Sequence, residues 1–331
     1  MSSVTILGID IGKNSFHLHG QDAQGHQVLR KKLNRSKLLP LLAQMPPCKV
    51  AMESCGGSQF LTREITKLGH QVQLIAPQNV KAYVTGTEGI CEAASRPRTR
   101  FVQAKSVDQQ VLSTVHKLRK SLVSRRTGVI NQVHGFLLEF GVIFPAGYAA
   151  LERVPALMEE HNLPLRLTLA INRMLDDIRQ LTSEIKALDT EIKPQVNRSD
   201  AGKRLQSIPG IGPLIASALV ADVGNASMYK SSRDFSASLG LVLRQYSTGG
   251  QTTLQGISKR GDRYLRILLI QGAQTLLYLI DKRNDAPGDW ARNLQALKPL
   301  NKVACALANK MAKIVWVLLT KGGTYNGHFT V

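Results

Sequence analysis

The order of strand-like and helix-like segments in the first 85 residues constrains the fold of this chain more than any other feature. Three apolar, strand-like runs come first, at residues 4–9, 16–20 and 27–33. Strands then alternate with helices, at 38–44 (helix), 49–52 (strand), 59–68 (helix) and 71–76 (strand). Antiparallel strands followed by strand–helix alternation predict an α/β domain, built as a mixed sheet with helices on its faces.

This order of elements is that of a ribonuclease-H-like fold, and two acids stand at the ends of its predicted strands. Asp10 and Glu53 each lie at the end of a short apolar run that predicts a buried strand. A strand end is a rigid place from which to aim a carboxylate at a metal ion. A two-metal phosphoryl-transfer site needs more than two acids, and residues 85–95 offer only Glu88 and Glu92.

Length and charge narrow the functional class. The chain has 331 residues, enough for two or three domains, and a formal net charge of +20. Such an excess predicts a polyanionic partner, with nucleic acid favoured over a membrane surface. We expect no signal peptide and no bilayer-spanning stretch. The four cysteines lack metal-ligand spacing and indicate free thiols in a reducing cytoplasm: Cys48, Cys55, Cys91 and Cys305.

Residues 96–126 form a strongly basic stretch with a single acid, Asp108. Its cations are Arg96, Arg98, Arg100, Lys105, Lys117, Arg119, Lys120, Arg125 and Arg126. From about Ser106 the stretch has helical periodicity, carried by Val107, Val111, Val115, Leu118 and Leu122. A solvated helix face normally mixes charges of both signs, so this one-signed stretch favours contact with a nucleic-acid backbone.

A heptad pattern follows between residues 167 and 192. Its apolar positions are Leu167, Ile171, Met174, Ile178, Leu181, Ile185, Leu188 and Ile192. Steps of alternately four and three residues predict a long helix in a coiled coil or a helical hairpin. Its partner is either another chain or the basic helix of residues 106–140 folding back.

The last third of the chain is predicted to be mostly helical and contains two motifs. The turn Pro209-Gly210-Ile211-Gly212 resembles the hairpin of helix-hairpin-helix modules, in which glycines let backbone N–H groups approach a phosphate. The alternative is a helix–helix turn without a ligand. The second motif places Ser247 and Thr248 beside two glycines, in an exposed loop that cations can surround: Arg244, Lys259, Arg260 and Arg263. Such a loop fits a serine that attacks a phosphodiester, or a phosphate-binding loop without chemistry.

Together these motifs resemble one family, the insertion-sequence transposases with an N-terminal RuvC-like DEDD domain and a C-terminal serine-bearing domain. Pilin-gene inverting recombinases are relatives of this family. The resemblance covers nearly the whole chain in order. The matching motifs include Gly8-Ile9-Asp10, Met52-Glu53-Ser54, Cys91–Pro97, Arg100-Phe101-Val102, Leu138–Gly141, Ile208–Gly212 and the block Ser247–Asp262.

The resemblance implies a RuvC-like domain at 1–105, a basic helix and coiled-coil linker at 106–200, and a transposase domain at 201–331. It implies a bacterial, cytoplasmic and nucleoid-associated enzyme that binds donor and target DNA under the guidance of a structured non-coding "bridge" RNA. Dimers or tetramers would join the acids of one subunit to the serine of another. Asp10 and Glu53 match the first two Mg²⁺-binding acids. Ser247 matches the serine that links covalently to DNA, with Thr248 as the alternative.

The chain departs from this family at the third and fourth acids. The family has an Asn-Asp…Asp-Ala-Glu segment before the position of Ile90, where this chain is shorter and has Gly86-Thr87-Glu88-Gly89. Glu88 matches the glutamate beside the lost aspartates and can compensate only in part. We therefore expect weak Mg²⁺ binding and impaired cleavage. The competing functions are a non-catalytic RNA- or DNA-binding protein and a RuvC-like structure-specific nuclease that acts without the serine.

Overall fold

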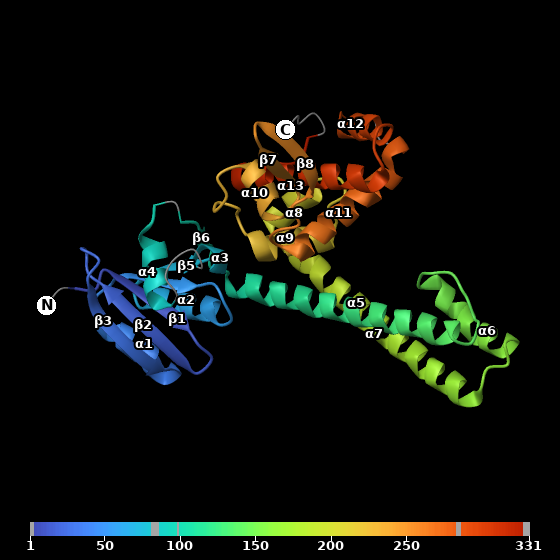
Figure 1. The fold of residues 1–331 in the computed structure, drawn as a ribbon, viewed down its shortest axis with the longest axis horizontal. Coiled ribbons are helices and arrows are strands. Elements are labelled where there is room, and N and C mark those ends of the chain that lie inside the picture. Colours follow the sequence, from blue (N-terminus) through green and yellow to red (C-terminus); the bar gives the residue numbers. More distant parts are fainter. Residues whose placement is uncertain (1–2, 81–85, 98, 283–285, 327–331) are drawn as a thin grey trace. The chain divides into compact units, whose positions relative to one another are not determined.

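The computed structural model describes residues 3–80, 86–97, 99–282 and 286–326 (Figure 1). The chain divides into two compact units, Met1–Ser106 and Val107–Val331. Arg98, one of the predicted nucleic-acid-binding residues, lies outside the described residues.

The first unit contains a six-stranded mixed sheet in the order β3-β2-β1-β4-β5-β6. Its strands are β1 (Ile6–Ile11), β2 (Ser15–Gln21), β3 (Gln27–Asn34), β4 (Lys49–Glu53), β5 (Gln71–Ile75) and β6 (Phe101–Val102). The first three strands are antiparallel, β4 and β5 run parallel to β1, and β6 is antiparallel to β5. The predicted mixed sheet is therefore confirmed, and β6 is a strand that the sequence did not reveal.

Helices cover both faces of this sheet. They are α1 (Arg35–Gln44), α2 (Ser58–Lys67), α3 (Pro77–Val80) and α4 (Thr87–Ser95). Leu7 and Ile9 of β1 pack into one buried cluster with side chains of α1 and α2. The opposite face, on which Gly8 lies, receives α4. A Cβ at Gly8 would lie 2.6 Å from the Thr87 carbonyl oxygen, so β1 and α4 can approach closely only because this residue is glycine.

The second unit begins with two long helices that pack along each other, α5 (Val107–Leu138) and α7 (Leu165–Arg198) (Figure 1). A short 3₁₀ helix, η1 (Ala149–Arg153), and α6 (Val154–Glu160) lie between them in sequence. Leu122 of α5 clusters with Leu181 and Ile185 of α7. Of the two partners that the heptad pattern left open, the basic helix of the same chain therefore covers the heptad face.

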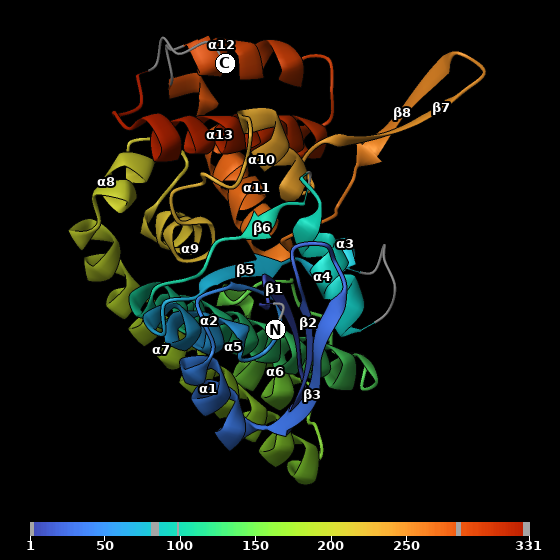
Figure 2. The same ribbon diagram turned by 90° about the vertical axis from the view of Figure 1, so that its left-hand side faces the viewer.

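The remainder of this unit is mostly helical. Its helices are α8 (Asp200–Gln206), α9 (Pro213–Val223), α10 (Ser232–Ser238), α11 (Arg263–Tyr278), η2 (Ile280–Lys282), α12 (Ala286–Gln295) and α13 (Leu300–Lys321). They share one large apolar core. The strands β7 (Leu243–Thr248) and β8 (Gln251–Ile257) form a separate two-stranded hairpin, which projects from these helices in Figure 2.

One described helix, α13, is long and apolar enough to cross a membrane by length and composition alone. The expectation of no such stretch was therefore wrong at this helix. Val303, Leu307, Met311 and Val315 of α13 are nonetheless buried in the apolar core that it shares with α9 and α11. The same composition is typical of the central helix of a globular core, which is the role that α13 has here.

Candidate functional site

The two acids predicted from the sequence lie on neighbouring strands. The parallel register pairs Ile9 of β1 with Met52 of β4, so Asp10 and Glu53 occupy the next position along and share one face of the sheet. Asp10 is the penultimate residue of β1 and Glu53 is the last residue of β4, so both acids lie at strand ends, as predicted. Burial raises the pKa of the nearby Cys55 thiol, and the charges of Glu53 and Asp10 raise it further.

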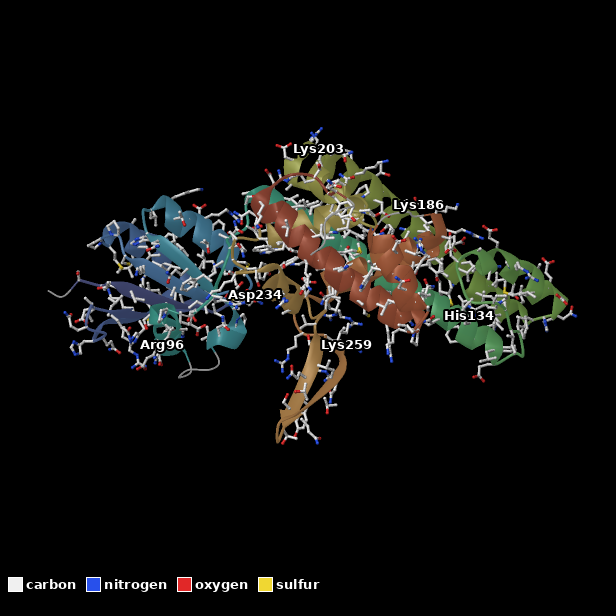
Figure 3. All side chains as sticks on the ribbon, turned by 90° about the horizontal axis from the view of Figure 1, so that it is seen from above. Arg96, His134, Lys186, Lys203, Asp234 and Lys259 are labelled. Carbon is white, nitrogen blue, oxygen red and sulfur yellow. The ribbon has the colours of Figure 1, made fainter. Side chains whose placement is uncertain are left out.

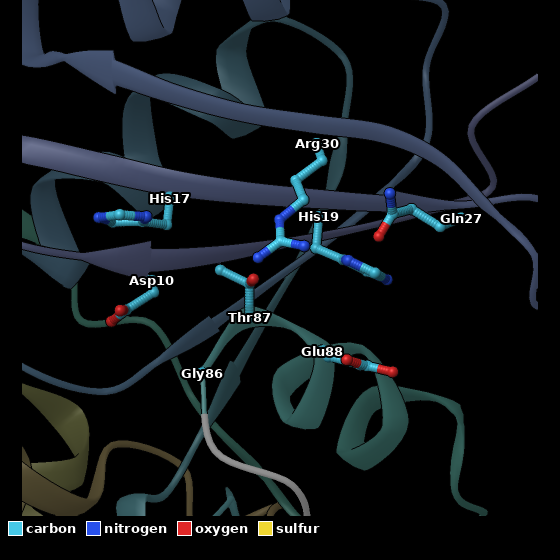
Figure 4. A pocket seen from close by; sticks show the side chains of 8 residues that line it. All are labelled: Asp10, His17, His19, Gln27, Arg30, Gly86, Thr87 and Glu88. Carbon is cyan, nitrogen blue, oxygen red and sulfur yellow. The ribbon is translucent and has the colours of Figure 1, made fainter.

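A pocket of about 260 Å³ opens beside Asp10 (Figure 4). It is lined by Asp10, His17, His19, Gln27, Arg30, Gly86, Thr87 and Glu88. Glu88 thus shares this pocket with Asp10. Within the described ranges, no three His, Cys, Asp or Glu side chains come together closely enough to hold a metal ion. The acids that are present fit weak, water-rich binding of one divalent ion, and do not form the multi-acid cluster of a two-metal site.

The basic stretch is divided between structural and exposed cations. Arg119 of α5 makes a bidentate ion pair with Asp189 of α7, at 2.5 and 3.1 Å. Arg126 donates to the Thr182 hydroxyl at 3.3 Å. Both arginines therefore hold α5 against α7. The exposed α5 cations are Lys117, Lys120 and Arg125, of which Lys120 has its Nζ over the Tyr264 ring, 5.7 Å from the centroid.

In the first unit, Arg96 pairs with Glu92 at 2.7 Å. Arg100 and Lys105 lie on either side of β6, outside any helix. The nucleic-acid role of all these cations stays a prediction.

A buried polar network, which the sequence analysis missed, connects α5 with the helical core. His116 Nε2 lies 2.8 Å from the Ser217 hydroxyl of α9, and Nδ1 lies 3.1 Å from the Tyr264 hydroxyl of α11. Burial lowers the pKa of His116 to about 4. The spacing from Leu112 could have indicated that His116 is buried. His116 follows the buried Leu112 by four residues, about one helical turn, so both lie on the same side of α5.

Ser247 and Thr248 end β7, next to the turn Gly249-Gly250. Positive φ angles of +55° and +81° at the two glycines are typical of a two-residue hairpin turn. Every residue of β7 is exposed. The Gln245 side chain donates to Ser247 Oγ at 2.8 Å, and the Thr252 hydroxyl lies 3.4 Å from the same oxygen.

Alternation along the strands gives this hairpin two distinct faces. Gln245, Ser247 and Thr252 share one of them, which we call the serine face. Tyr246 and Thr248 point to the opposite side. The two candidate nucleophiles therefore cannot occupy equivalent positions against one bound strand.

The predicted ring of cations around the serine is not present in this hairpin. Lys259, Arg260 and Arg263 follow the base of the hairpin in sequence, beyond the pair Leu243–Ile257. Figure 3 shows Lys259 at this base. Ser247 lies four residues farther along β7, roughly 13 Å away at the rise of an extended strand. Arg244 belongs to β7, at a shift in the register of the hairpin between Leu243 and Gln245. The physical reason for the missing ring is that the loop is an extended hairpin, which separates its tip from its base.

The Pro-Gly-Ile-Gly turn connects α8 with α9, as the helix-hairpin-helix resemblance predicted. An open groove of about 540 Å³ lies beside it and is lined by the turn and by Leu268, Gln271 and Thr275 of α11. Gly210 packs against the backbone of α11, whereas a Cβ at Gly212 would meet nothing within 4 Å. Gly212 is therefore the more accessible of the two glycines predicted to approach a phosphate.

A mixed sheet with neighbouring carboxylates, in a strongly basic chain, fits a RuvC-like protein that acts on nucleic acid. Comparison with known families narrows this class. A DEDD transposase model of the IS110 group matches residues 7–142, and a model described as "Transposase IS116/IS110/IS902 family" matches residues 202–286. A DEDD-type domain in general points to the use of a divalent metal ion.

Full-length relatives agree with these matches. The chain is 45% identical to the transposase for insertion sequence element IS1328 of Yersinia enterocolitica, over 98% of this chain and 100% of the relative. It is 43% identical to a probable family 20 transposase of Pseudomonas aeruginosa, over 96% and 98%. It is 37% identical to the transposase for insertion sequence element IS1111A of Coxiella burnetii, over 98% and 92%. The chain therefore belongs to the IS110/IS116/IS902 family of DNA transposases.

Proposed function

We propose that this transposase is an RNA-guided recombinase that exchanges DNA strands through a covalent link between Ser247 and DNA. The observation that carries the proposal is the exposed Ser247 hydroxyl near the tip of a projecting hairpin, where a DNA backbone can reach it. The net charge of +20 supports nucleic-acid partners. We infer that these are donor DNA, target DNA and a structured guide RNA, bound by a dimer or tetramer at the bacterial nucleoid.

Ser247 is the better nucleophile candidate because of its surroundings. Because the Gln245 amide donates to Ser247 Oγ, this hydrogen bond does not engage the serine's own proton, which must leave when the oxygen attacks phosphorus. Attack forms a new P–O bond to the serine and breaks the bond between phosphorus and a sugar oxygen, and the serine proton passes through water to that oxygen, which leaves as a hydroxyl. Thr248 has no such donor on its own face among the contacts of the described hairpin. A second subunit or a bound divalent ion would have to supply positive charge for the phosphate, since Lys259, Arg260 and Arg263 lie beyond the base of the hairpin.

The acid pair supports a metal-assisted step of reduced efficiency. Asp10 and Glu53 would hold a divalent ion such as Mg²⁺, which would polarise a phosphate oxygen when bound. Glu88 lines the same pocket as Asp10 but forms no three-ligand group with the two acids in the described structure, so it would act as a third ligand only after a rearrangement. Because a hard cation with two carboxylate ligands keeps most of its water, we propose that cleavage in this chain is slower than in relatives with four acids.

Two other functions follow from single observations. The incomplete acid cluster favours a non-catalytic RNA- or DNA-binding protein on the same scaffold. The intact Asp10–Glu53 pair is compatible with a structure-specific nuclease that does not use the serine. The first predicts binding without a covalent adduct, and the second predicts cleavage that survives Ser247→Ala.

The test is a denaturing gel of the purified protein incubated with flanking non-coding RNA, donor DNA, target DNA and Mg²⁺. We expect a covalent protein–DNA band that is lost in Ser247→Ala and kept in Thr248→Ala, its matched control on the opposite face. Loss only in Thr248→Ala would move the nucleophile to Thr248. RNA-dependent binding without any band would support the non-catalytic alternative, and metal-dependent cleavage that Asp10→Ala alone abolishes would support the nuclease.

A further inference from the structure

The sheet register aligns the two acids with a histidine and a lysine on one face. Asp10 of β1 pairs with His17 of β2, and His17 pairs with Lys32 of β3. Since Glu53 lies beside Asp10 on β4, the four residues form one row across four strands. We call this set, Glu53, Asp10, His17 and Lys32, the acid row. Neighbouring strands are about 4.8 Å apart, so Lys32 lies roughly 10 Å from Asp10 along the row.

A second cation lies next to this row on the same face. Arg30 of β3 pairs with His19 of β2, two residues from Lys32 and therefore on the same side of the strand. Figure 4 shows the Arg30 guanidinium reaching into the pocket that Asp10 and His17 also line. Both Arg30 and Lys32 are exposed, and β3 is the edge strand of the sheet. A strand that enters from this edge of the sheet would therefore meet Arg30 and Lys32 before it reaches the acids.

We propose that Arg30, Lys32 and His17 bind the backbone phosphates of the nucleic-acid strand that is presented to Asp10 and Glu53. This inference rests on one part of the proposed function, namely that a nucleic-acid strand binds at Asp10 and Glu53. A phosphodiester is an anion, and two carboxylates repel it. A site that brings a nucleic-acid strand to two carboxylates therefore needs cations that can reach the phosphates of that strand. Guanidinium groups bind phosphate oxygens in pairs, and lysine binds them as a point charge.

The chain offers a matched control within the same strand. Lys31 lies between the two proposed ligands, carries the same charge and is also exposed. It pairs with Leu18, whose side chain is buried in the cluster on the other face of the sheet. Lys31→Ala therefore removes one charge from β3 without removing a side chain from the acid-row face.

Cys55 provides a local reporter of strand binding that does not depend on cleavage. It is exposed and close enough to Glu53 and Asp10 for their charges to act on its thiol. Cys48 and Cys91 are buried, and Cys305 is half-buried in the second unit. Alkylation at Cys55, identified by peptide mass mapping, therefore reports on whether a bound strand covers the acid pair.

The experiment uses the full chain without divalent metal and a single-stranded DNA or RNA oligonucleotide. Affinity is measured by fluorescence anisotropy over a salt series, and Cys55 alkylation by iodoacetamide is measured with and without the oligonucleotide. We expect the oligonucleotide to slow alkylation several-fold in the wild type and in Lys31→Ala. The Arg30→Ala/Lys32→Ala double variant should lose this protection and reduce the salt slope by roughly two.

Equal protection and equal salt slopes in the double variant and Lys31→Ala would overturn the proposal. Equal alkylation rates of all three free proteins verify that the sheet is intact. His17→Ala alone should weaken protection by a smaller factor than the double variant. Protection of Cys55 without a serine adduct would preserve this inference and refute the recombinase mechanism. A serine adduct that does not depend on Arg30 and Lys32 would support the recombinase mechanism and refute this inference.

Discussion

Gly210 and Gly272 contact each other through their backbones. A Cβ at Gly210 would lie 2.7 Å from the carbonyl oxygen of Gly272, and a Cβ at Gly272 would lie 2.3 Å from that of Gly210. Gly210 also has a φ of +81°, which favours glycine over residues with side chains. The turn between α8 and α9 is therefore fixed directly on α11, whose N-terminus begins close to the base of the β7–β8 hairpin.

We expect Gly210→Ala to destabilise the protein by about 1–3 kcal/mol, because the added methyl group meets backbone atoms that cannot move aside. Gly272→Ala should have a similar effect from the other side of the same contact. Gly212→Ala is the control, since its Cβ would project into open space. Urea unfolding of the three variants measures the difference. Equal stability of Gly210→Ala and Gly212→Ala would show that the contact is not rigid.

The two glycines also illustrate what the sequence could predict at this site. The motif correctly indicated a tight turn between two helices, because glycine spacing encodes local backbone geometry. It could not indicate that Gly210 packs on Gly272, which is 62 residues away and in a different helix. If the turn also binds phosphate, Gly212→Ala should lower nucleic-acid affinity without lowering stability.

The hydrogen bond from Gln245 to Ser247 leads to a prediction about strand transfer. Gln245→Leu removes the donor and should slow formation of the covalent adduct about tenfold, the effect of losing roughly 1.4 kcal/mol from one hydrogen bond. Oligonucleotide affinity should stay unchanged, because the serine face keeps its shape. Thr253→Val, on the opposite face of the same hairpin, is the matched control. An adduct rate that falls equally in both variants would assign Gln245 to the general stability of the hairpin.

Two cations of α5 should respond to substitution in opposite ways. Arg119→Ala leaves the Asp189 carboxylate without its bidentate partner and should destabilise the packing of α5 on α7 by about 1–3 kcal/mol. Lys117→Ala should leave stability within about 0.5 kcal/mol and reduce the salt dependence of nucleic-acid binding by roughly one. Thermal unfolding and anisotropy titrations on both variants separate the two roles. Destabilisation by Lys117→Ala would contradict this assignment.

The same helix shows where periodicity is a limited guide. The apolar positions that predicted a helix include Val107, Val111 and Leu118, each more than half exposed. Leu122, another of these positions, is buried, together with Leu112 and His116, which the predicted pattern did not include. The spacing predicted the helix correctly. It did not predict which face of the helix is buried, because the polar His116 interrupts the apolar pattern of that face. In β1 and β4, by contrast, uninterrupted apolar runs left a single choice, and the neighbouring positions of Asp10 and Glu53 followed from strand order.

His116 should make the stability of the second unit depend on pH. Burial lowers its pKa to about 4, while Asp222 and Asp189 act in the opposite direction and Arg119 adds to the lowering. An unfolded chain binds a proton near pH 6.5, whereas the folded chain binds it only near pH 4. The unfolded state therefore holds more protons in this interval. Stability is fully present above about pH 6.5 and falls by at most about 3 kcal/mol as the pH approaches 4.

Replacing His116 by glutamine should remove this pH dependence, because glutamine can hydrogen-bond to Ser217 but does not titrate. We expect His116→Gln to lose a smaller free energy of unfolding between pH 7.5 and pH 4.5 than the wild type, even if it is less stable at pH 7.5. His161→Asn, at an exposed position after α6, controls for histidine titration in general. Urea unfolding at several pH values gives the comparison, and parallel pH curves for the wild type and His116→Gln would exclude His116 as the source.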